Sequence, residues 1–436
     1  MRRLTTTDAD FTRVLTELTR LRHDPSAAPE VVDRVREILG QVARAGDAAL
    51  LQWTRALDRW EPRDAQALLV TDSQRSAALD AVGSDVRRDL ELAAQRIRRF
   101  HVRQRELAWS FETEDGVRLG QRVIPLAAVG VYVPGGTAAY PSSVLMNVVP
   151  ARVAGVGEIV MVTPSPDGRL SDVVVAAAAI AGVDVIVRVG GAQAIGALAR
   201  GTETVPRVDK IVGPGNAWVA EAKRQVFGQV AIDMIAGPSE VVIVATRDGG
   251  ASPEALAADL LAQAEHDARA MATLLSPDAA LLEAVAASVA EQLERLPRRA
   301  IAGAALRDFG LLIHTRDVDD AMRIAELLAP EHLEIVTPDA EARAETVRNA
   351  GAIFVGPHSP EALGDYVLGP NHVLPTNGTA RFSSPLGVTD FVKRTNILRV
   401  SRAGLEALGP VAVRLARLEG LTAHAESLSV RLPRET

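Results

Sequence analysis

The chain contains no cysteine among its 436 residues. This absence removes thiolate metal ligands, thiol nucleophiles and disulfide bonds together. Any chemistry must therefore come from imidazole, carboxylate, amide and hydroxyl groups and from the backbone. A chain without disulfides also agrees with a cytoplasmic location, which we take as the default expectation.

Long hydrophobic runs and dense basic runs are also missing. The longest apolar stretch, residues 173–183, is well short of the ~20 residues that a membrane-spanning helix needs. Residues 1–5 turn polar at once and lack the apolar core of a signal peptide. The net charge is −7 and the arginines are scattered, which disfavours nucleic acid as a partner. We therefore expect neither a membrane nor a nucleic-acid partner.

The overall composition is that of a globular protein, with 47% hydrophobic and 24% charged residues. A chain of this length can form two or three domains with a large buried core. Residues 31–43 and 73–100 carry apolar positions at helical spacing, so we expect the first part of the chain to be mostly helical. The tail from about residue 389 to 436 is expected to be a small, mainly helical appendage.

From about residue 126 the pattern becomes a repeated apolar run, turn and helix. The runs predicted to be strands are Ile159–Val162, Val185–Val189, Lys210–Val212, Val241–Val244, Leu311–His314, Leu333–Val336 and Ala352–Val355. Short apolar strands that alternate with helices predict parallel sheets with helices on both faces. We find no low-complexity linker, so the domains are expected to pack closely.

Two glycine-rich turns, Gly190–Gln193 and Gly213–Asn216, each follow a predicted strand and precede a predicted helix. At such a turn, free backbone N–H groups and the helix dipole favour a phosphate group. Neither turn has the G-x-G-x-x-G fingerprint. The pattern leaves two interpretations open, a nucleotide site or turns that simply need glycine.

Four of the eight histidines lie in polar segments with carboxylate or amide neighbours. These are His266, His332, His372 and His424. Gln263 lies three positions before His266 in a predicted helix, so both side chains should project from one face and could bind one metal ion. The pattern indicates a metal site of histidine, carboxylate and amide ligands, with zinc as the first candidate. Each histidine alone is equally compatible with a hydrogen-bonded structural role.

Eight collinear segments resemble histidinol dehydrogenases over nearly the whole chain. They are Val131–Gly136, Gly190–Ile195, Gly213–Ala217, Ile232–Glu240, Leu260–His266, Ala329–Glu334, Gly364–Thr376 and Glu419–His424. The resemblance implies an α/β fold with two Rossmann-like but incomplete parallel-sheet domains and small helical extensions at both ends, in an intertwined homodimer. The implied division is an N-terminal extension (1–28), a metal and substrate domain (29–131 and 243–385), an NAD domain (132–242) and a C-terminal dimerisation extension (386–436).

The resemblance also implies an activity. Enzymes of this family oxidise L-histidinol through L-histidinal to L-histidine, the last steps of histidine biosynthesis, with NAD and one zinc ion per subunit. The implied zinc ligands are Gln263, His266, Asp365 and His424. The implied catalytic pair is Glu331 and His332. The implied substrate contacts are Ser239, His372 and Glu419, together with His332 and the zinc ligands. The implied NAD contacts are Tyr132, Gln193 and Asn216. Glu419 and His424 are expected to complete the site of the partner subunit.

The lack of cysteine bears on the second oxidation, because many aldehyde oxidisers form a thiohemiacetal at this stage and this chain cannot. We expect Glu331 to activate a water molecule that hydrates the aldehyde. His332 is expected to remove the hydroxyl proton, since the pKa of an imidazole lies near working pH. NAD is the expected hydride acceptor. Zinc is expected to anchor the substrate, with Lewis-acid activation of the reacting oxygen as the alternative.

Three other functions are compatible with parts of the pattern. The first is a zinc- and NAD-dependent dehydrogenase of the same fold that acts on another small polar alcohol. Glu419 counts against it, because a carboxylate can pair with the ammonium group of histidinol. The second is a metallohydrolase, which the NAD-type segments disfavour. The third is a non-catalytic metal-binding or scaffold protein, which leaves Glu331 and His332 without a purpose.

Overall fold

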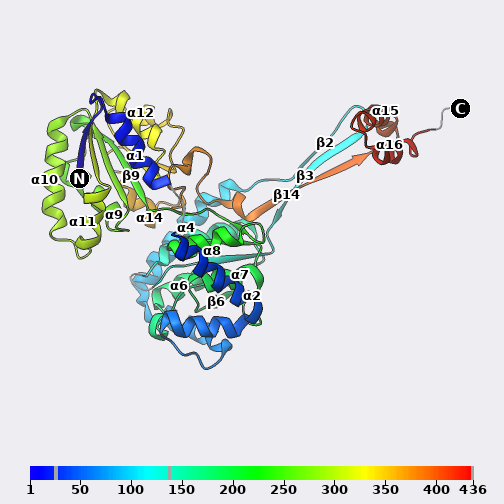
Figure 1. Cartoon of the computed structure of the whole chain (residues 1–436), viewed down its shortest axis with the longest axis horizontal. Coiled ribbons are helices and arrows are strands. Elements are labelled where there is room, and N and C mark those ends of the chain that lie inside the picture. The colour runs from blue at the N-terminus through cyan, green and yellow to red at the C-terminus, as the bar shows by residue number, and fades with distance from the viewer. Residues whose placement is uncertain (24–27, 136–138, 434–436) are drawn as a thin grey trace.

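The computed structural model describes residues 1–23, 28–135 and 139–433. Its described residues form two parallel sheets covered by helices, together with an antiparallel arm that projects away from them (Figure 1). The predicted α/β class with parallel sheets is therefore confirmed. Gly136, in one of the family-like segments, and residues 24–27 of the predicted N-terminal extension lie outside the described residues. Among the described helices, none combines the length and apolar character that crossing a bilayer requires.

The larger sheet has six strands in the order β1-β11-β10-β9-β12-β13, and all neighbours run parallel. The strands are β1 (Arg2–Thr5), β9 (Glu240–Ala245), β10 (Met271–Ser276), β11 (Leu311–His314), β12 (His332–Val336) and β13 (Ala352–Val355). Successive side chains of β9 enter different cores, Val241 and Ile243 on one face and Val242 and Val244 on the other. This alternation requires helices on both faces of the sheet.

The helices associated with this sheet are α1 (Phe11–His23), α9 (Pro253–Ala264), α10 (Ala279–Leu293), α11 (Arg299–Asp308), α12 (Val318–Leu328), α13 (Ala340–Ala344) and α14 (Glu361–Tyr366). Side chains of α9, α10 and α11 build one core, and those of α1 and α12 build the core on the opposite face. Several of these helices begin at a side-chain cap, as where Ser252 accepts a hydrogen bond from the N–H of Ala255 at 3.2 Å.

The second sheet has five parallel strands in the order β6-β5-β4-β7-β8. They are β4 (Ala128–Tyr132), β5 (Glu158–Val162), β6 (Val185–Val187), β7 (Lys210–Val212) and β8 (Ala231–Ile232). The chain runs outward from β4 through β5 to β6 and then continues with β7 on the other side of β4. The strand order therefore reverses between β4 and β7, and open α/β sheets bind ligands outside the carboxyl ends of their strands at such a point.

Helices α2 (Pro29–Asp58), α3 (Asp72–Ala81), α4 (Gly83–His101), α5 (Pro141–Ala154), α6 (Asp172–Ala181), α7 (Gly191–Arg200) and α8 (Ala217–Val226) surround the five-stranded sheet. The predicted division assigned residues 29–131 to the same domain as 243–385. In the structure α2 packs against α7 and α8, and α3 and α4 pack against α6. Val35 and Leu39 of α2, for example, share a core with Ile195 of α7. This part of the division is therefore wrong, since the N-terminal helices bury their apolar faces on the five-stranded sheet.

The arm is a three-stranded antiparallel sheet with two helices at its tip (Figure 1). It consists of β2 (Trp109–Glu112), β3 (Val117–Pro125), β14 (Val392–Val400), α15 (Arg402–Leu418) and α16 (Thr422–Ser429). β14 pairs with β3 from Val392 opposite Pro125 to Val400 opposite Val117. The mainly helical tail that the sequence predicts therefore begins with a strand. Short 3₁₀ turns at Ala65–Leu68, Val102–Gln104, Pro166–Gly168, Arg247–Gly249, Thr379–Arg381 and Val388–Phe391 complete the described elements.

Candidate active site

A cavity of about 1600 Å³ lies between the two parallel sheets. Its walls come from the carboxyl ends of the five-stranded sheet and from the amino ends of the six-stranded sheet, where β12 starts at His332. The predicted site residues that line it are Tyr132, Gln193, Asn216, Ser239, His266, Glu331, His332, Asp365 and His372. Residues predicted for two different ligands, a nucleotide and a metal-bound substrate, thus face one continuous space.

His332 is 3% exposed and is held in one orientation by the backbone of β9. Its Nδ1 donates a hydrogen bond to the carbonyl oxygen of Glu240 at 2.9 Å. Because a carbonyl oxygen can only accept, the proton of the neutral ring is on Nδ1 and the lone pair is on Nε2. Nε2 has no hydrogen-bond partner among the described residues. Burial lowers the pKa of His332 to about 3, whereas the sequence predicts a pKa near working pH. The ring is therefore neutral, and Nε2 can accept a proton.

Glu331 directly precedes His332 and is 6% exposed. Its Oε2 accepts a hydrogen bond from the backbone N–H of Glu240 at 2.9 Å. Burial raises the pKa of Glu331 well above its usual value, and the nearby charges of Glu240, Asp365 and Glu361 add to the rise. The ionised form of a carboxyl group with a raised pKa is a stronger base, which suits a group that must take a proton from water.

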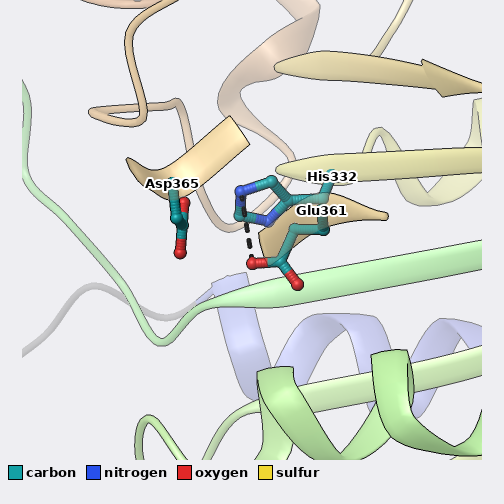
Figure 2. A group of neighbouring side chains, drawn as sticks. All are labelled: His332, Glu361 and Asp365. Atoms are coloured by element: carbon teal, nitrogen blue, oxygen red, sulfur yellow. Dashed lines mark ion pairs between the residues drawn. The ribbon is translucent and has the colours of Figure 1, made fainter. Parts of the chain in front are cut away.

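His332, Glu361 and Asp365 form a group whose candidate ligand atoms all lie within 4.8 Å of one another (Figure 2). Asp365 follows Glu361 by one turn of α14, and His332 reaches the same point from β12. The distance from His332 Nε2 to Glu361 Oε1 is 3.9 Å. Burial raises the pKa of Asp365 to about 7 and that of Glu361 well above its usual value. Crowded carboxylates beside an imidazole suit a divalent cation, whose charge would relieve their repulsion.

Gln263 lies at the end of α9 and is completely buried. Neither its Oε1 nor its Nε2 has a hydrogen-bond partner among the described residues. A buried amide left in this state costs about 1–3 kcal/mol for each unpaired group, so a ligand for its oxygen would be stabilising. His266 lies in the turn that follows the helix, because α9 ends at Ala264. The sequence predicts that the two residues share one face of a continuous helix, and this prediction is wrong. His266 nevertheless lines the cavity.

His372 completes the polar end of the cavity. Its Nδ1 donates a hydrogen bond to the backbone oxygen of Asp365 at 3.0 Å, which leaves Nε2 as the acceptor. Burial lowers the pKa of His372 to about 4, and the nearby His266 adds to the effect. The ring is therefore neutral, as a histidine that contacts a metal-bound or cationic substrate should be.

The side of the cavity that carries the predicted nucleotide contacts is built around the first turns of α7 and α8. Tyr132 ends β4, and its hydroxyl oxygen accepts a hydrogen bond from the N–H of Gly191 at 3.2 Å. Gln193 lies in the first turn of α7 and is 1% exposed. Asn216 caps α8, since its Oδ1 accepts hydrogen bonds from two backbone N–H groups of the first turn. α8 follows β7 and so begins next to the strand-order reversal, where a helix amino terminus is a favourable place for a phosphate group.

A buried ion pair fixes the turn at Gly213. Lys223 Nζ pairs with Asp233 Oδ1 and also donates a hydrogen bond to the backbone oxygen of Gly213 at 3.0 Å. The other oxygen of Asp233 accepts a hydrogen bond from the N–H of Gly213 at 2.8 Å. Gly213 has a φ of 109°, and a Cβ there would lie 2.1 Å from the backbone oxygen of Tyr132. Glycine is therefore required at this position, and the ion pair holds the turn on both sides.

The chain is similar to the proteins of one known family. The family model for histidinol dehydrogenase matches residues 21–432. The chain belongs to the histidinol dehydrogenase family. Relatives named histidinol dehydrogenase include one from Nitrosospira multiformis, 51% identical over 431 residues, which cover 99% of this chain and 97% of the relative. Another, from Aromatoleum aromaticum, is 52% identical over 432 residues, 99% and 98% of the two chains.

The fold agrees with that of a solved family member. The crystal structure of histidinol dehydrogenase from Elizabethkingia anophelis matches with a TM-score of 0.92 at 34% sequence identity, covering 99% of this chain and 98% of that one. The family inferred from eight sequence segments is therefore confirmed, and so is the conclusion that the chain is an oxidoreductase enzyme.

Two residues that the histidinol dehydrogenase motifs single out lie on the arm. Glu419 directly follows α15 and His424 lies on α16, and both are exposed. Figure 1 shows these helices at the tip of the arm, far from the cavity-lining elements of the same chain. A single chain therefore does not bring Glu419 and His424 to its own site, and their role in the site of a partner subunit stays a prediction.

Glu361 belongs to the candidate metal-binding group with His332 and Asp365, but it was not identified from the sequence. Glu361 precedes Asp365 by four positions, a spacing that places both carboxyl groups on one face of a helix. That spacing was the available signal. What the sequence did not reveal is that Glu361 is 1% exposed, whereas most glutamates with such a spacing lie on the surface.

Proposed function

We propose that this member of the histidinol dehydrogenase family oxidises L-histidinol through L-histidinal to L-histidine, with NAD as the hydride acceptor in both steps. The observation that carries the proposal is the single cavity that Glu331 and His332 share with the nucleotide-side residues Tyr132, Gln193 and Asn216. Such sharing is what hydride transfer requires, because the carbon that loses the hydride must contact the nicotinamide. A cytoplasmic location is part of the same proposal.

In the first oxidation His332 removes the proton of the substrate hydroxyl group as the hydride leaves the carbon. Its Nε2 carries the lone pair because Nδ1 is tied to the carbonyl oxygen of Glu240. The proton therefore arrives at a defined atom of a ring that cannot rotate without losing that bond. The lowered pKa of His332 keeps the ring unprotonated before the reaction at neutral pH.

In the second oxidation Glu331 takes a proton from a water molecule, whose oxygen adds to the aldehyde carbon. The resulting hydrate loses a second hydride to NAD, and the carboxylic acid is formed. The carboxylate oxygen Oε2 of Glu331 is held by the N–H of Glu240, so the group is oriented before water arrives. Since the chain has no cysteine, a thioester route is not open to it.

We propose Gln263, His266 and Asp365 as zinc ligands from one subunit. The unpaired amide of Gln263 and the raised pKa of Asp365 support this assignment, since a cation would satisfy the first and favour ionisation of the second. Glu361 lies close enough to Asp365 to reach the same ion. Bound zinc would supply a Lewis-acidic centre that holds the polar groups of the substrate. Ser239 and His372 are proposed to contact the substrate directly.

The fourth ligand, His424, and the substrate contact Glu419 are proposed to come from the arm of a partner subunit in a homodimer. The arm exposes several large apolar side chains, including Trp109 (53% exposed), Leu398 (69%) and Leu418 (84%). Exposed apolar side chains in this number on a projecting element are typical of a surface that another chain covers.

The division of labour within the catalytic pair can be tested with two variants. Glu331→Gln keeps the size of the side chain but cannot accept a proton, so it should spare the oxidation of histidinol and slow that of histidinal. His332→Asn should slow the histidinol step as well. Formation of reduced NAD from each substrate in turn measures the two steps separately, with exposed Glu341→Gln and His358→Asn as matched controls. Equal loss of both steps in both variants would contradict the assignment.

The choice of substrate needs its own experiment. Histidinol should be oxidised far faster than alcohols that lack either the imidazole or the amine, because each group has a proposed partner in the site. If another small polar alcohol had the higher kcat/KM, the chain would be a dehydrogenase of the same family with a different substrate.

A further inference from the structure

Asp58 is the last residue of α2 and is 7% exposed. It lines the nucleotide side of the cavity together with Tyr132 and Gln193. Its carboxylate accepts a hydrogen bond from the backbone N–H of Ser165, but its Oδ2 has no hydrogen-bond partner among the described residues. The sequence gives no reason to single this residue out, and neither of the two oxidation steps uses it.

The position of Asp58 is unfavourable for a carboxylate. A negative charge at the carboxyl end of a helix lies at the negative end of the helix dipole. Burial also raises the pKa of Asp58 to about 6, because the ionised form has lost most of its contact with water. A buried, incompletely paired acid at the wall of a binding cavity is therefore maintained at a cost in stability, and such groups are frequent at functional sites.

Two further buried polar atoms near the same wall have no hydrogen-bond partner among the described residues. Trp53 lies on α2, lines the cavity and carries an unpaired Nε1–H donor. Gln193 on α7 carries an unpaired acceptor, Oε1. Together with Asp58 Oδ2, the wall therefore offers one unpaired donor and two unpaired acceptors. Hydroxyl groups fit such a set, because each can donate one hydrogen bond and also accept one. A phosphate group, which only accepts at neutral pH, would leave the acceptors unpaired and would be repelled by the carboxylate.

We infer that Asp58 contacts the cofactor, accepts hydrogen bonds from the hydroxyl groups of a ribose, and favours a 2′-hydroxyl over a 2′-phosphate on that sugar. The inference rests on the proposed use of NAD. In dinucleotide-binding folds an acidic residue after the second strand of the unit usually binds the ribose. Asp233 has that position after β8, but Lys223 and the backbone N–H groups of Gly213 and Met234 already engage both of its carboxylate oxygens. α2 lies before all strands of the five-stranded sheet, and it supplies an acid from outside the strand-turn-helix unit.

The test compares wild type with Asp58→Asn by steady-state kinetics with histidinol and with NAD or NADP. The variant should raise the KM for NAD by roughly tenfold to a hundredfold, as loss of a charge-assisted hydrogen bond does. The kcat and the KM for histidinol should change little, and the ratio of kcat/KM for NADP to that for NAD should rise. Trp53→Phe, which removes only the Nε1 donor, should raise the KM for NAD by a smaller factor. Asp167→Asn is the matched control, because Asp167 is exposed, pairs with Arg59 and does not line the cavity.

Thermal unfolding without cofactor separates cofactor contact from a purely structural role. If Asp58 serves the cofactor, Asp58→Asn should have a Tm equal to or above that of wild type. A lower Tm, or a fall in kcat with an unchanged KM for NAD, would overturn the inference. An unchanged KM in a variant of full stability would overturn it equally. Failure of wild type to reduce NAD with histidinol would instead refute the proposed function, so the two failures are distinguishable.

Discussion

The buried ion pair between Lys223 and Asp233 allows a quantitative prediction for Lys223→Met. The two side chains are 3% and 1% exposed, and methionine has nearly the same length as lysine without its charge. The substitution leaves the carboxylate of Asp233 buried without its cation. Removing one partner of a buried pair costs about 3–5 kcal/mol.

The backbone around Asp233 sets where in this range the effect should fall. The carboxylate keeps its hydrogen bonds from the N–H groups of Gly213 and Met234, at 2.8 and 2.6 Å. These bonds compensate part of the lost interaction, so we expect destabilisation of about 3 kcal/mol. For a folding unit of about 200 residues this corresponds to a fall in Tm of roughly 6–12 °C. The KM for NAD should also rise, because the backbone oxygen of Gly213 loses its hydrogen bond from Lys223.

Urea unfolding followed by circular dichroism measures the free energy, and Lys393→Met on the exposed face of β14 is the control. The double variant Lys223→Met/Asp233→Asn should recover part of the loss, since it leaves no buried charge. Two results would refute the reasoning. One is a loss below about 1 kcal/mol in Lys223→Met, well outside the range for a broken buried pair. The other is a double variant as unstable as the sum of the two single variants.

Three further predictions concern the assembly, the metal and the pH dependence. Equal mixing of Glu331→Gln and His424→Asn subunits should recover about one quarter of the wild-type rate of histidinal oxidation, because half of the dimers are mixed and each has one intact site. No recovery would place His424 in the site of its own chain. Removal of metal by a chelator should abolish binding of histidinol in calorimetry and leave binding of NAD unchanged, and equal loss of both would contradict the proposed ligand set. The pKa of Asp58 in the folded state is raised from its ordinary value of 3.8 to about 6. Wild type should therefore lose stability relative to Asp58→Asn as pH rises from about 4 to 6, and it should remain less stable above that pH. Parallel curves of unfolding free energy against pH for the two proteins would refute the shift.

The strands of the two parallel sheets could be predicted because their residues form short apolar runs that both faces of a sheet bury. The prediction located β9, β11, β12 and β13 of the six-stranded sheet within about two residues. It omitted β1 and β10. β1 begins with two arginines, and Thr273 and Ser276 interrupt the apolar run of β10, although all residues of β10 are buried. Apolar runs therefore reveal a buried strand well, except where small polar residues are tolerated in its interior.

The N-terminal helices illustrate a different limit. Helical periodicity predicts that α2 has an apolar face, but the same face could pack on either sheet. The contacts of Val35 and Leu39 with Ile195 are long-range, and no local signal in the sequence encodes them. The strands of the arm were missed for a related reason, since Val392–Val400 is exposed on both faces and shows no alternation between apolar and polar residues.

The candidate site was predictable where short motifs place several chemical groups close together in the sequence, as in Glu331 and His332. It was not predictable where the function of a group depends on burial. Glu361 and Asp58 resemble surface acids in the sequence, and only the structure reveals that their carboxylates lack solvent. The unexpectedly low pKa of His332 has the same origin, because burial is a property of the folded chain.

The arm also constrains the order in which the molecule can form. Its sheet joins segments from distant parts of the chain, and Gln121 Nε2 donates a hydrogen bond to Asn396 Oδ1, 275 positions later. Closing so large a loop costs chain entropy, and it becomes favourable only after the intervening residues have already collapsed. The arm should therefore be among the last parts to fold, and on the ribosome it cannot form until nearly all of the chain has been synthesised. Any partner that binds the arm would meet a body that is already folded, so subunit exchange should not require the parallel sheets to unfold.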